Sequence, residues 1–359
     1  MKNHKSEDGE TRPHTRKRIL VIGGTGFIGS YLVQLLRDAG HELAALQRSA
    51  DAGPGSAGLL RIRGDRNRLS DCRMQIGQFA PEVIVDLILS SGQQAQQLIA
   101  ESREFTRRVV AISSMDVYRA WGVLHGNEPG PLEPLPLTED SPLRTVRQLY
   151  PPEKVKMLQS TFTWLDGHYD KIAVEQAILS DPFVPGTVVR LPMIYGAGDR
   201  LHRFFPLLKR IADGRRAIVL SEDFAAWRGP RGYVENIAYA IALAATSEHA
   251  AGRVYNVCQE PTLSELAWET MIAEQTKWNG KFAVLPRERT PKHLLQPGNA
   301  AQHVVASSER IRAELGYKEL VGMDEAIRRT VDWEHCNPPA TSDPEQFDYA
   351  AEDAALVSQ

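Results

Sequence analysis

Short apolar runs alternate with amphipathic segments along most of this chain. The runs that read as buried strands lie within residues 18–22, 41–49, 58–65, 81–89, 107–114 and 186–196. Apolar positions recur at helical spacing between them, for example over residues 170–180. Strands that alternate with helices predict an α/β fold with a mostly parallel sheet covered on both faces. From about residue 200 the pattern becomes irregular and more helical. We therefore expect a smaller, mostly helical C-terminal lobe.

The first strand runs directly into a glycine-rich turn, and a helical pattern follows. Gly23, Gly26 and Gly29 come at three-residue spacing. Glycines at such positions let the backbone turn sharply, approach a pyrophosphate and pack the helix against the strand. The exposed amides and the helix dipole then hold the phosphates. This context favours a dinucleotide site on a doubly wound Rossmann sheet over a purely structural turn. The cofactor-binding residues expected here are Gly23, Gly26, Phe27, Ile28 and Gly29.

Four regions are expected. Residues 1–17 mix both charge signs without an apolar centre, which predicts a disordered arm and not a secretory signal. Residues 18–195 form the dinucleotide-binding domain, with a surface insertion rich in Pro, Gly and charge at 119–160. Residues 196–336 form a substrate lobe that exchanges chain with the first domain. Residues 337–359 carry acids and no bases, which predicts a solvated, disordered acidic tail.

Composition narrows the function to small-molecule chemistry. The 359 residues have a formal net charge of −3, and no basic stripe is present, which argues against a nucleic-acid partner. No apolar run approaches the roughly 18 residues of a membrane helix. Cys72, Cys258 and Cys336 are far apart and lack metal-ligand spacing, so neither a metal site nor a disulfide framework is expected. A reducing, cytoplasmic location is predicted.

Several ordered motifs resemble the extended short-chain dehydrogenase/reductase superfamily, in its NAD-dependent epimerase/dehydratase branch. They are "GGTGFIG" at 23–29, "SSMDVY" at 113–118, "VEQAIL" shortly after Lys171, "RLPMIYG" at 190–196 and "RGYVENIA" at 231–238. The resemblance implies NAD(P) in the glycine turn, hydride transfer at nicotinamide C4, a homodimer, and a nucleotide sugar as the first substrate class to consider. The alternative is a catalytically silent, nucleotide-binding regulatory or scaffold member.

The same resemblance assigns two catalytic positions. Ser114 lies where the family places the hydroxyl that holds the reacting oxygen. Lys171 matches the lysine that binds the ribose and lowers the pKa of a tyrosine four residues before it. That tyrosine position is Gly167 here, so the proton donor is displaced.

Three interpretations of the proton donor stay open. Tyr169 lies two residues before Lys171, about 200° away on a regular helix, and reaches the site only if the helix starts late. His168 shares the lysine's face, and imidazole titrates near neutrality. Otherwise the chain has no donor. Tyr150 and Lys154 have the family spacing, but two prolines between them disfavour a helix, so we interpret that match as coincidental.

Cofactor choice and substrate contacts are predicted from fewer residues. Gln47 and Arg48 stand where NAD enzymes often carry an acid, and a guanidinium there would pair with a 2′-phosphate, which favours NADP over NAD. Asp65 fits the family position that contacts adenine, or it caps the next helix. The candidate substrate residues are Tyr195, Arg203 and Arg231, the arginines being placed for a diphosphate.

Overall fold

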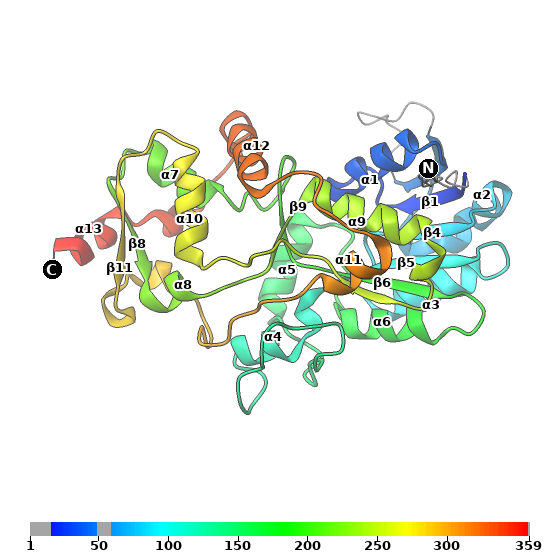
Figure 1. Ribbon diagram of the computed structural model, residues 1–359, viewed down its shortest axis with the longest axis horizontal. Helices are drawn as coiled ribbons and strands as arrows, with labels where there is room; N and C mark the ends of the chain where they lie inside the picture. The colour runs from blue at the N-terminus through cyan, green and yellow to red at the C-terminus, as the bar shows by residue number, and fades with distance from the viewer. Residues whose placement is uncertain (1–15, 49–58, 358–359) are drawn as a thin grey trace, which may run out of the picture.

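A seven-stranded parallel sheet organises the larger part of the molecule (Figure 1). The computed structural model describes residues 16–48 and 59–357, so residues 1–15 of the arm expected at 1–17 lie outside the described residues. The strand order, from one edge to the other, is β10 (Val254–Asn256), β6 (Gly186–Leu191), β5 (Arg108–Ser114), β4 (Val83–Asp86), β1 (Arg18–Ile22), β2 (Glu42–Gln47) and β3 (Leu60–Arg63). Every pairing in this sheet is parallel. The prediction of a doubly wound Rossmann sheet is confirmed.

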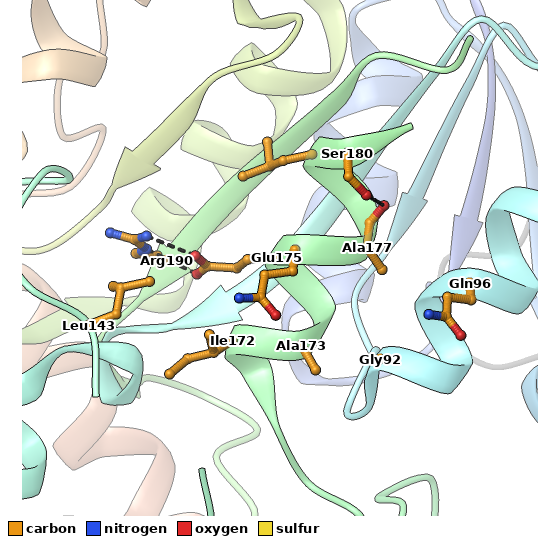
Figure 2. A pocket seen from close by; sticks show the side chains of 11 residues that line it. Gly92, Gln96, Leu143, Ile172, Ala173, Glu175, Ala177, Ser180 and Arg190 are labelled. Atoms are coloured by element: carbon orange, nitrogen blue, oxygen red, sulfur yellow. Dashed lines mark hydrogen bonds and ion pairs between the residues drawn. The ribbon is translucent and has the colours of Figure 1, made fainter. Parts of the chain in front are cut away.

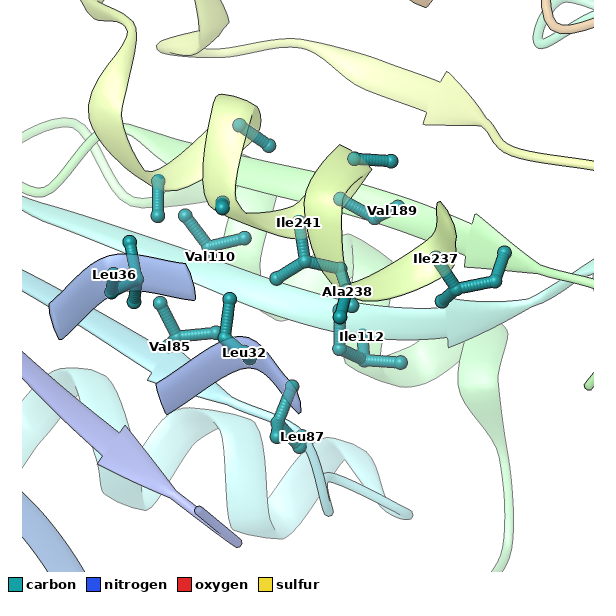
Figure 3. Close-up of a cluster of buried hydrophobic side chains, with 14 of the residues drawn as sticks. Leu32, Leu36, Val85, Leu87, Val110, Ile112, Val189, Ile237, Ala238 and Ile241 are labelled. Carbon is teal, nitrogen blue, oxygen red and sulfur yellow. The ribbon is translucent and has the colours of Figure 1, made fainter. Parts of the chain in front are cut away.

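Helices cover both faces of the sheet because each central strand is apolar on both sides. On β1, Ile19 and Val21 enter one buried cluster, whereas Leu20 and Ile22 enter the other. The first cluster is closed by α1 (Phe27–Asp38) and α9 (Val234–Thr246), as Figure 3 shows. The second is closed by three helices, α2 (Arg73–Phe79), α3 (Gly92–Ser102) and α6 (Lys171–Ser180).

The second lobe has its own core and two small parallel sheets. One pairs β7 (Met193–Tyr195) with β9 (Arg231–Tyr233), and the other pairs β8 (Ala217–Ser221) with β11 (Lys281–Leu285). The helices of this part are α7 (Phe205–Ala212), α8 (Glu222–Ala226), α10 (Glu265–Glu274) and α12 (Met323–Cys336), whereas α11 (Glu309–Leu315) packs on the large sheet beside α9 and β10. Short 3₁₀ turns lie at Arg66–Cys72, Met115–Val117, Glu248–Ala250, Arg287–Arg289, Lys292–Leu294 and Pro344–Phe347. None of the helices in the described part of the chain is long and apolar enough to cross a membrane.

The prediction of a disordered tail over residues 337–359 is wrong for residues 344–357, which contain a 3₁₀ turn and a helix, although most residues of the described part of this segment are exposed. Helix α13 (Tyr349–Val357) ends the described chain, and its Glu352 is fully buried. The Glu352 carboxylate accepts hydrogen bonds from Arg210 at 2.8 Å and pairs with His293 at 3.1 Å. The burial of Glu352 depends on these two cationic partners, because a buried acid must be paired.

The insertion at 119–160 carries two helices, α4 (Arg119–Leu124) and α5 (Pro152–Thr161). Figure 1 shows α5 between the large sheet and the second lobe. The expectation that Pro151 and Pro152 disfavour a helix is wrong for Lys154, which lies on α5, and right for Tyr150, which precedes the helix. Proline is tolerated in the first helical turn, where its missing N–H has no intrahelical acceptor, and α5 begins at Pro152 itself.

Candidate active site

The glycine turn joins β1 to α1 at the carboxyl edge of the sheet. Gly23 has φ +85°, a conformation that L side chains rarely adopt, and an added Cβ at Gly29 would lie 2.2 Å from the Gly23 carbonyl oxygen. Gly26 is the N-cap of α1 and has no side chain to cap its first amides. These features fit a pyrophosphate, because the helix N-terminus keeps its donors and no Cβ blocks the approach. Phe27 and Ile28 pack partly buried against the core, so they would contact a cofactor through the backbone.

The two residues predicted at the adenosine end have different surroundings. Arg48 follows β2, is exposed, and donates from Nη2 to Thr163 Oγ1 at 2.7 Å. Within the described part of the chain it forms no ion pair. Asp65 accepts a hydrogen bond from the Asn67 amide at 2.9 Å and caps the 3₁₀ turn that follows β3. The capping alternative for Asp65 is therefore present in the structure.

Helix α6 starts late, which is the condition under which Tyr169 reaches the site. Its N-cap is Asp170, whose carboxylate accepts from the amides of Ile172 at 3.0 Å and Ala173 at 3.1 Å. Tyr169 thus lies before the helix, free of its periodicity. The Tyr169 hydroxyl points to the Asp116 carboxylate at 2.8 Å, and the Lys171 Nζ lies 5.9 Å from the Tyr169 ring centroid.

Lys171 is buried between the ends of two neighbouring strands. Its ammonium donates to the Ile112 carbonyl of β5 at 2.9 Å and to the Leu89 carbonyl that follows β4. Burial lowers the pKa of Lys171 to about 8, and nearby Asp116 and Asp86 oppose that fall. A cation held at this edge can hydrogen-bond a ribose hydroxyl.

Ser114 lies beside the same tyrosine. Its Oγ accepts from the Asp116 amide at 3.2 Å, and a hydrogen bond with the Tyr169 hydroxyl acts to lower the pKa of that phenol. The local capping role and the placement next to Tyr169 therefore coexist. The structure brings Ser114, Tyr169 and Lys171 together.

His168 is not part of this cluster. Its side chain is exposed, and its backbone amide donates a hydrogen bond to Asp166 Oδ1 at 2.8 Å. Among the described residues, no side chain of the cluster contacts the His168 ring.

Sequence reasoning missed two members of the cluster, Asp116 and Tyr150. Asp116 is 4% exposed, and its Oδ2 accepts from Tyr169 and also from Tyr150 at 3.3 Å. The two phenol rings lie 6.0 Å apart. The interpretation of Tyr150 as coincidental is wrong about its position, since the insertion carries it into the site. The literal Tyr-x-x-x-Lys spacing was the available signal, and Lys154 does lie 4.8 Å from the Tyr150 ring centroid.

Burial dominates the electrostatics of this cluster. It raises the pKa of Tyr169 and of Tyr150 well above 10, and the adjacent Asp116 charge adds to the effect. Burial also raises the pKa of Asp116 itself. Both phenols are therefore protonated at neutral pH and donate hydrogen bonds.

The candidate substrate residues are already engaged with other parts of the chain. Tyr195 is 1% exposed, and its hydroxyl donates to Gln259 at 2.7 Å. Arg203 pairs with Asp199 at 2.8 Å, and Arg231 pairs with Glu265 at 2.5 Å. A diphosphate would have to displace a carboxylate from either guanidinium.

The fold and this cluster together define a Rossmann protein whose glycine turn faces a Ser–Tyr–Lys site. A family model described as the NAD dependent epimerase/dehydratase family matches residues 19–258. The chain belongs to the NAD-dependent epimerase/dehydratase family.

Solved structures of similar fold cover almost the whole chain. A UDP-glucose 4-epimerase from Thermus thermophilus, in complex with NAD, has a TM-score of 0.61 at 21% identity and covers 89% of this chain and 99% of its own. A dTDP-glucose 4,6-dehydratase from Bacillus anthracis, also with NAD, has a TM-score of 0.62 at 16% identity, covering 89% and 97%. An epimerase from Methanothermobacter thermautotrophicus has a TM-score of 0.63 at 16% identity, covering 90% and 94%. No match was found among curated protein sequences. At these sequence identities the structural similarity is evidence for the fold alone.

Proposed function

We propose that this protein is an NAD(P)-dependent oxidoreductase of the epimerase/dehydratase type, working in the cytoplasm on a hydroxyl or carbonyl carbon of a nucleotide sugar. The observation that carries the proposal is the convergence of Ser114, Tyr169 and Lys171 at the same sheet edge as the glycine turn. The sugar-nucleotide class is taken from the family and from what the similar structures are described as binding.

Each residue of the cluster has a role that follows from its contacts. When bound, the nicotinamide ring exchanges a hydride at C4. The Ser114 hydroxyl holds the reacting substrate oxygen, and Tyr169 exchanges a proton with that oxygen. Lys171, fixed by two backbone carbonyls, binds the ribose. Asp116 orients the Tyr169 hydroxyl through their 2.8 Å hydrogen bond.

The test is mass spectrometry of the nucleotide released from freshly purified protein, followed by NADH and NADPH titrations of the stripped form. Retained NAD would indicate an epimerase or dehydratase that regenerates its cofactor within each cycle. An empty protein that binds added dinucleotide would indicate a reductase that exchanges its cofactor. A protein that binds neither would reject the proposal and leave the glycine turn with a structural role only.

We propose NADP as the preferred cofactor, with Arg48 as the residue that selects it. Replacing Arg48 by Ala is expected to weaken NADPH binding about tenfold to a hundredfold and to leave NADH binding within about threefold. The 2′-phosphate of NADPH loses its charged partner, whereas the lost hydrogen bond to Thr163 affects the two cofactors alike. Fluorescence titrations with both cofactors measure this. Equal losses for the two dinucleotides would contradict the assignment. Thr163→Val is the control, because it removes the hydrogen bond between Arg48 and Thr163 and leaves the charge of the Arg48 guanidinium in place.

A homodimer is the proposed assembly, with α3 and α6 as the contact face. A surface groove of about 610 Å³ lies between these helices (Figure 2), and α6 presents small or uncharged side chains there, at Ala173, Gln176, Ala177 and Ser180. The Glu175–Arg190 ion pair that also lines the groove is buried, so the exposed side chains of this helix pair are small or uncharged and suit packing against a second copy of the chain.

Replacing Ala177 by Arg is expected to convert the dimer to a monomer, because it buries an unpaired charge at the two-fold contact. Light scattering after size exclusion gives the mass directly. Leu320→Arg is the matched control, since Leu320 is 52% exposed outside these two helices. A wild-type monomer, or an Ala177→Arg dimer, would refute this interface.

A further inference from the structure

The segment between α5 and α6 is attached to the carboxyl edge of the sheet at two separate places. Arg48, directly after β2, donates to Thr163 Oγ1 at 2.7 Å. Ser91, in the loop after β4, donates from Oγ to Asp166 Oδ2 at 2.8 Å. The Asp166 amide in turn donates to Ser90 Oγ at 2.9 Å.

These two attachments lie on opposite sides of β1. The order of the sheet is β4, β1, β2, so β1 and the glycine turn that follows it stand between the anchoring strands. Two strand spacings amount to about 9.5 Å, and three residues from Thr163 to Asp166 span at most about 10 Å. The segment is therefore long enough to cross the end of β1 and too short to pass around the side of the sheet.

The segment is held by a few side-chain bonds and by no strand ladder. Gln159 donates to the Leu165 carbonyl at 3.2 Å, and Asp166 Oδ1 accepts from the His168 amide at 2.8 Å. Thr163 itself is exposed. These bonds are few and none of them belongs to a strand ladder, although those of Asp166 to Ser90 and Ser91 are partly buried. A segment held in this way can open locally, at a small fraction of the free energy of global unfolding.

We propose that residues 162–170 form a clasp that closes over the dinucleotide-binding turn and opens to let the cofactor enter and leave. The inference rests on the proposed function, because it takes the turn to hold a dinucleotide. Thr163 closes the adenosine side, and Asp166 closes the side toward Lys171. Tyr169 lies at the C-terminal end of the clasp, so the motion that encloses the cofactor also sets the phenol against Asp116.

The clasp predicts faster cofactor exchange when its anchors are removed. Asp166→Ala and Thr163→Val each remove one anchor, and stopped-flow fluorescence with NADH and NADPH measures association and release. We expect release to rise roughly tenfold in Asp166→Ala, severalfold in Thr163→Val, and more in the double variant. Association rises in the same order, because opening precedes entry. Ser160→Ala is the matched control, since that hydroxyl bonds only to the Met157 carbonyl of its own helix, and its rates stay at the wild-type values.

A second measurement needs no variant. Hydrogen–deuterium exchange of the wild-type chain should slow across residues 162–170 when saturating NADH is added. The clasp would be overturned, with the proposed function intact, if the wild-type protein binds the cofactor without slowing hydrogen–deuterium exchange in this segment and both anchor variants bind and release the cofactor at wild-type rates. Wild-type protein that binds neither dinucleotide would overturn both.

Discussion

Replacing Tyr169 by Phe is expected to reduce turnover roughly 10²- to 10⁴-fold, the range that a positioned proton donor contributes. The ring and its packing remain in this variant, and only the hydroxyl that bonds to Asp116 at 2.8 Å is lost. The Kd for the cofactor should stay within about twofold, because Lys171 keeps both of its backbone acceptors. Turnover of UDP-glucose and dTDP-glucose, followed beside an NADH titration, measures both quantities.

Two variants locate the donor. His168→Ala should leave turnover unchanged, because that imidazole is exposed and outside the cluster. Tyr150→Phe should have an intermediate effect, since the Tyr150 hydroxyl bonds to Asp116 at 3.3 Å and would act on Tyr169 through that carboxylate. A large loss in His168→Ala together with an active Tyr169→Phe would reject the assignment of Tyr169.

The protonation state of Tyr169 follows from its surroundings. In the family pattern a lysine lowers the pKa of the tyrosine, whereas here burial and the Asp116 carboxylate raise it. A phenol in this state holds its proton at neutral pH, so Tyr169 is in the form of a proton donor.

Most of the fold was predictable because its determinants are local. Residues Ile19–Ile22 lie in a strand that is buried on both faces, and the glycines directly after them form the turn into the first helix. The late start of α6 was also readable. Asp170 is a preferred N-cap residue, and placing it there would have put Tyr169 outside the helix from the beginning.

The rest depended on partners far away in the chain. Tyr150 reaches the site through Asp116, 34 residues earlier, and nothing near Tyr150 records that contact. Glu352 is buried because Arg210, 142 residues before it, supplies the opposite charge. Composition alone cannot separate an acid that is solvated from one that is paired, and for that reason the end of the chain was predicted wrongly.

Alanine at Gly29 and alanine at Gly26 are expected to fail in different ways. A Cβ at Gly29 would lie 2.2 Å from the Gly23 carbonyl oxygen and 2.7 Å from the Gly24 Cα. Backbone atoms cannot move aside cheaply, so β1 and α1 must separate, at about 1–3 kcal/mol of overpacking. We expect Gly29→Ala to lower the free energy of unfolding by that amount and to lose cofactor binding, because the displaced turn no longer presents its amides together. Urea unfolding and NADH titration measure the two losses.

Gly26→Ala should keep its stability and lose only binding. The nearest atom to a Cβ there is the Gly23 carbonyl oxygen at 3.2 Å, and φ is −81°, which any residue adopts. An unfolding free energy within about 1 kcal/mol of wild type is expected, since alanine is only a poorer N-cap than glycine. The same methyl group stands where the backbone must approach a pyrophosphate, and it would keep the phosphates away from the backbone amides. NADH affinity should therefore fall by on the order of tenfold or more. A Gly26→Ala protein that binds NADH as tightly as wild type would show that the turn joins the strand to the helix and does nothing more. If binding falls while stability holds, the turn is in contact with the phosphates.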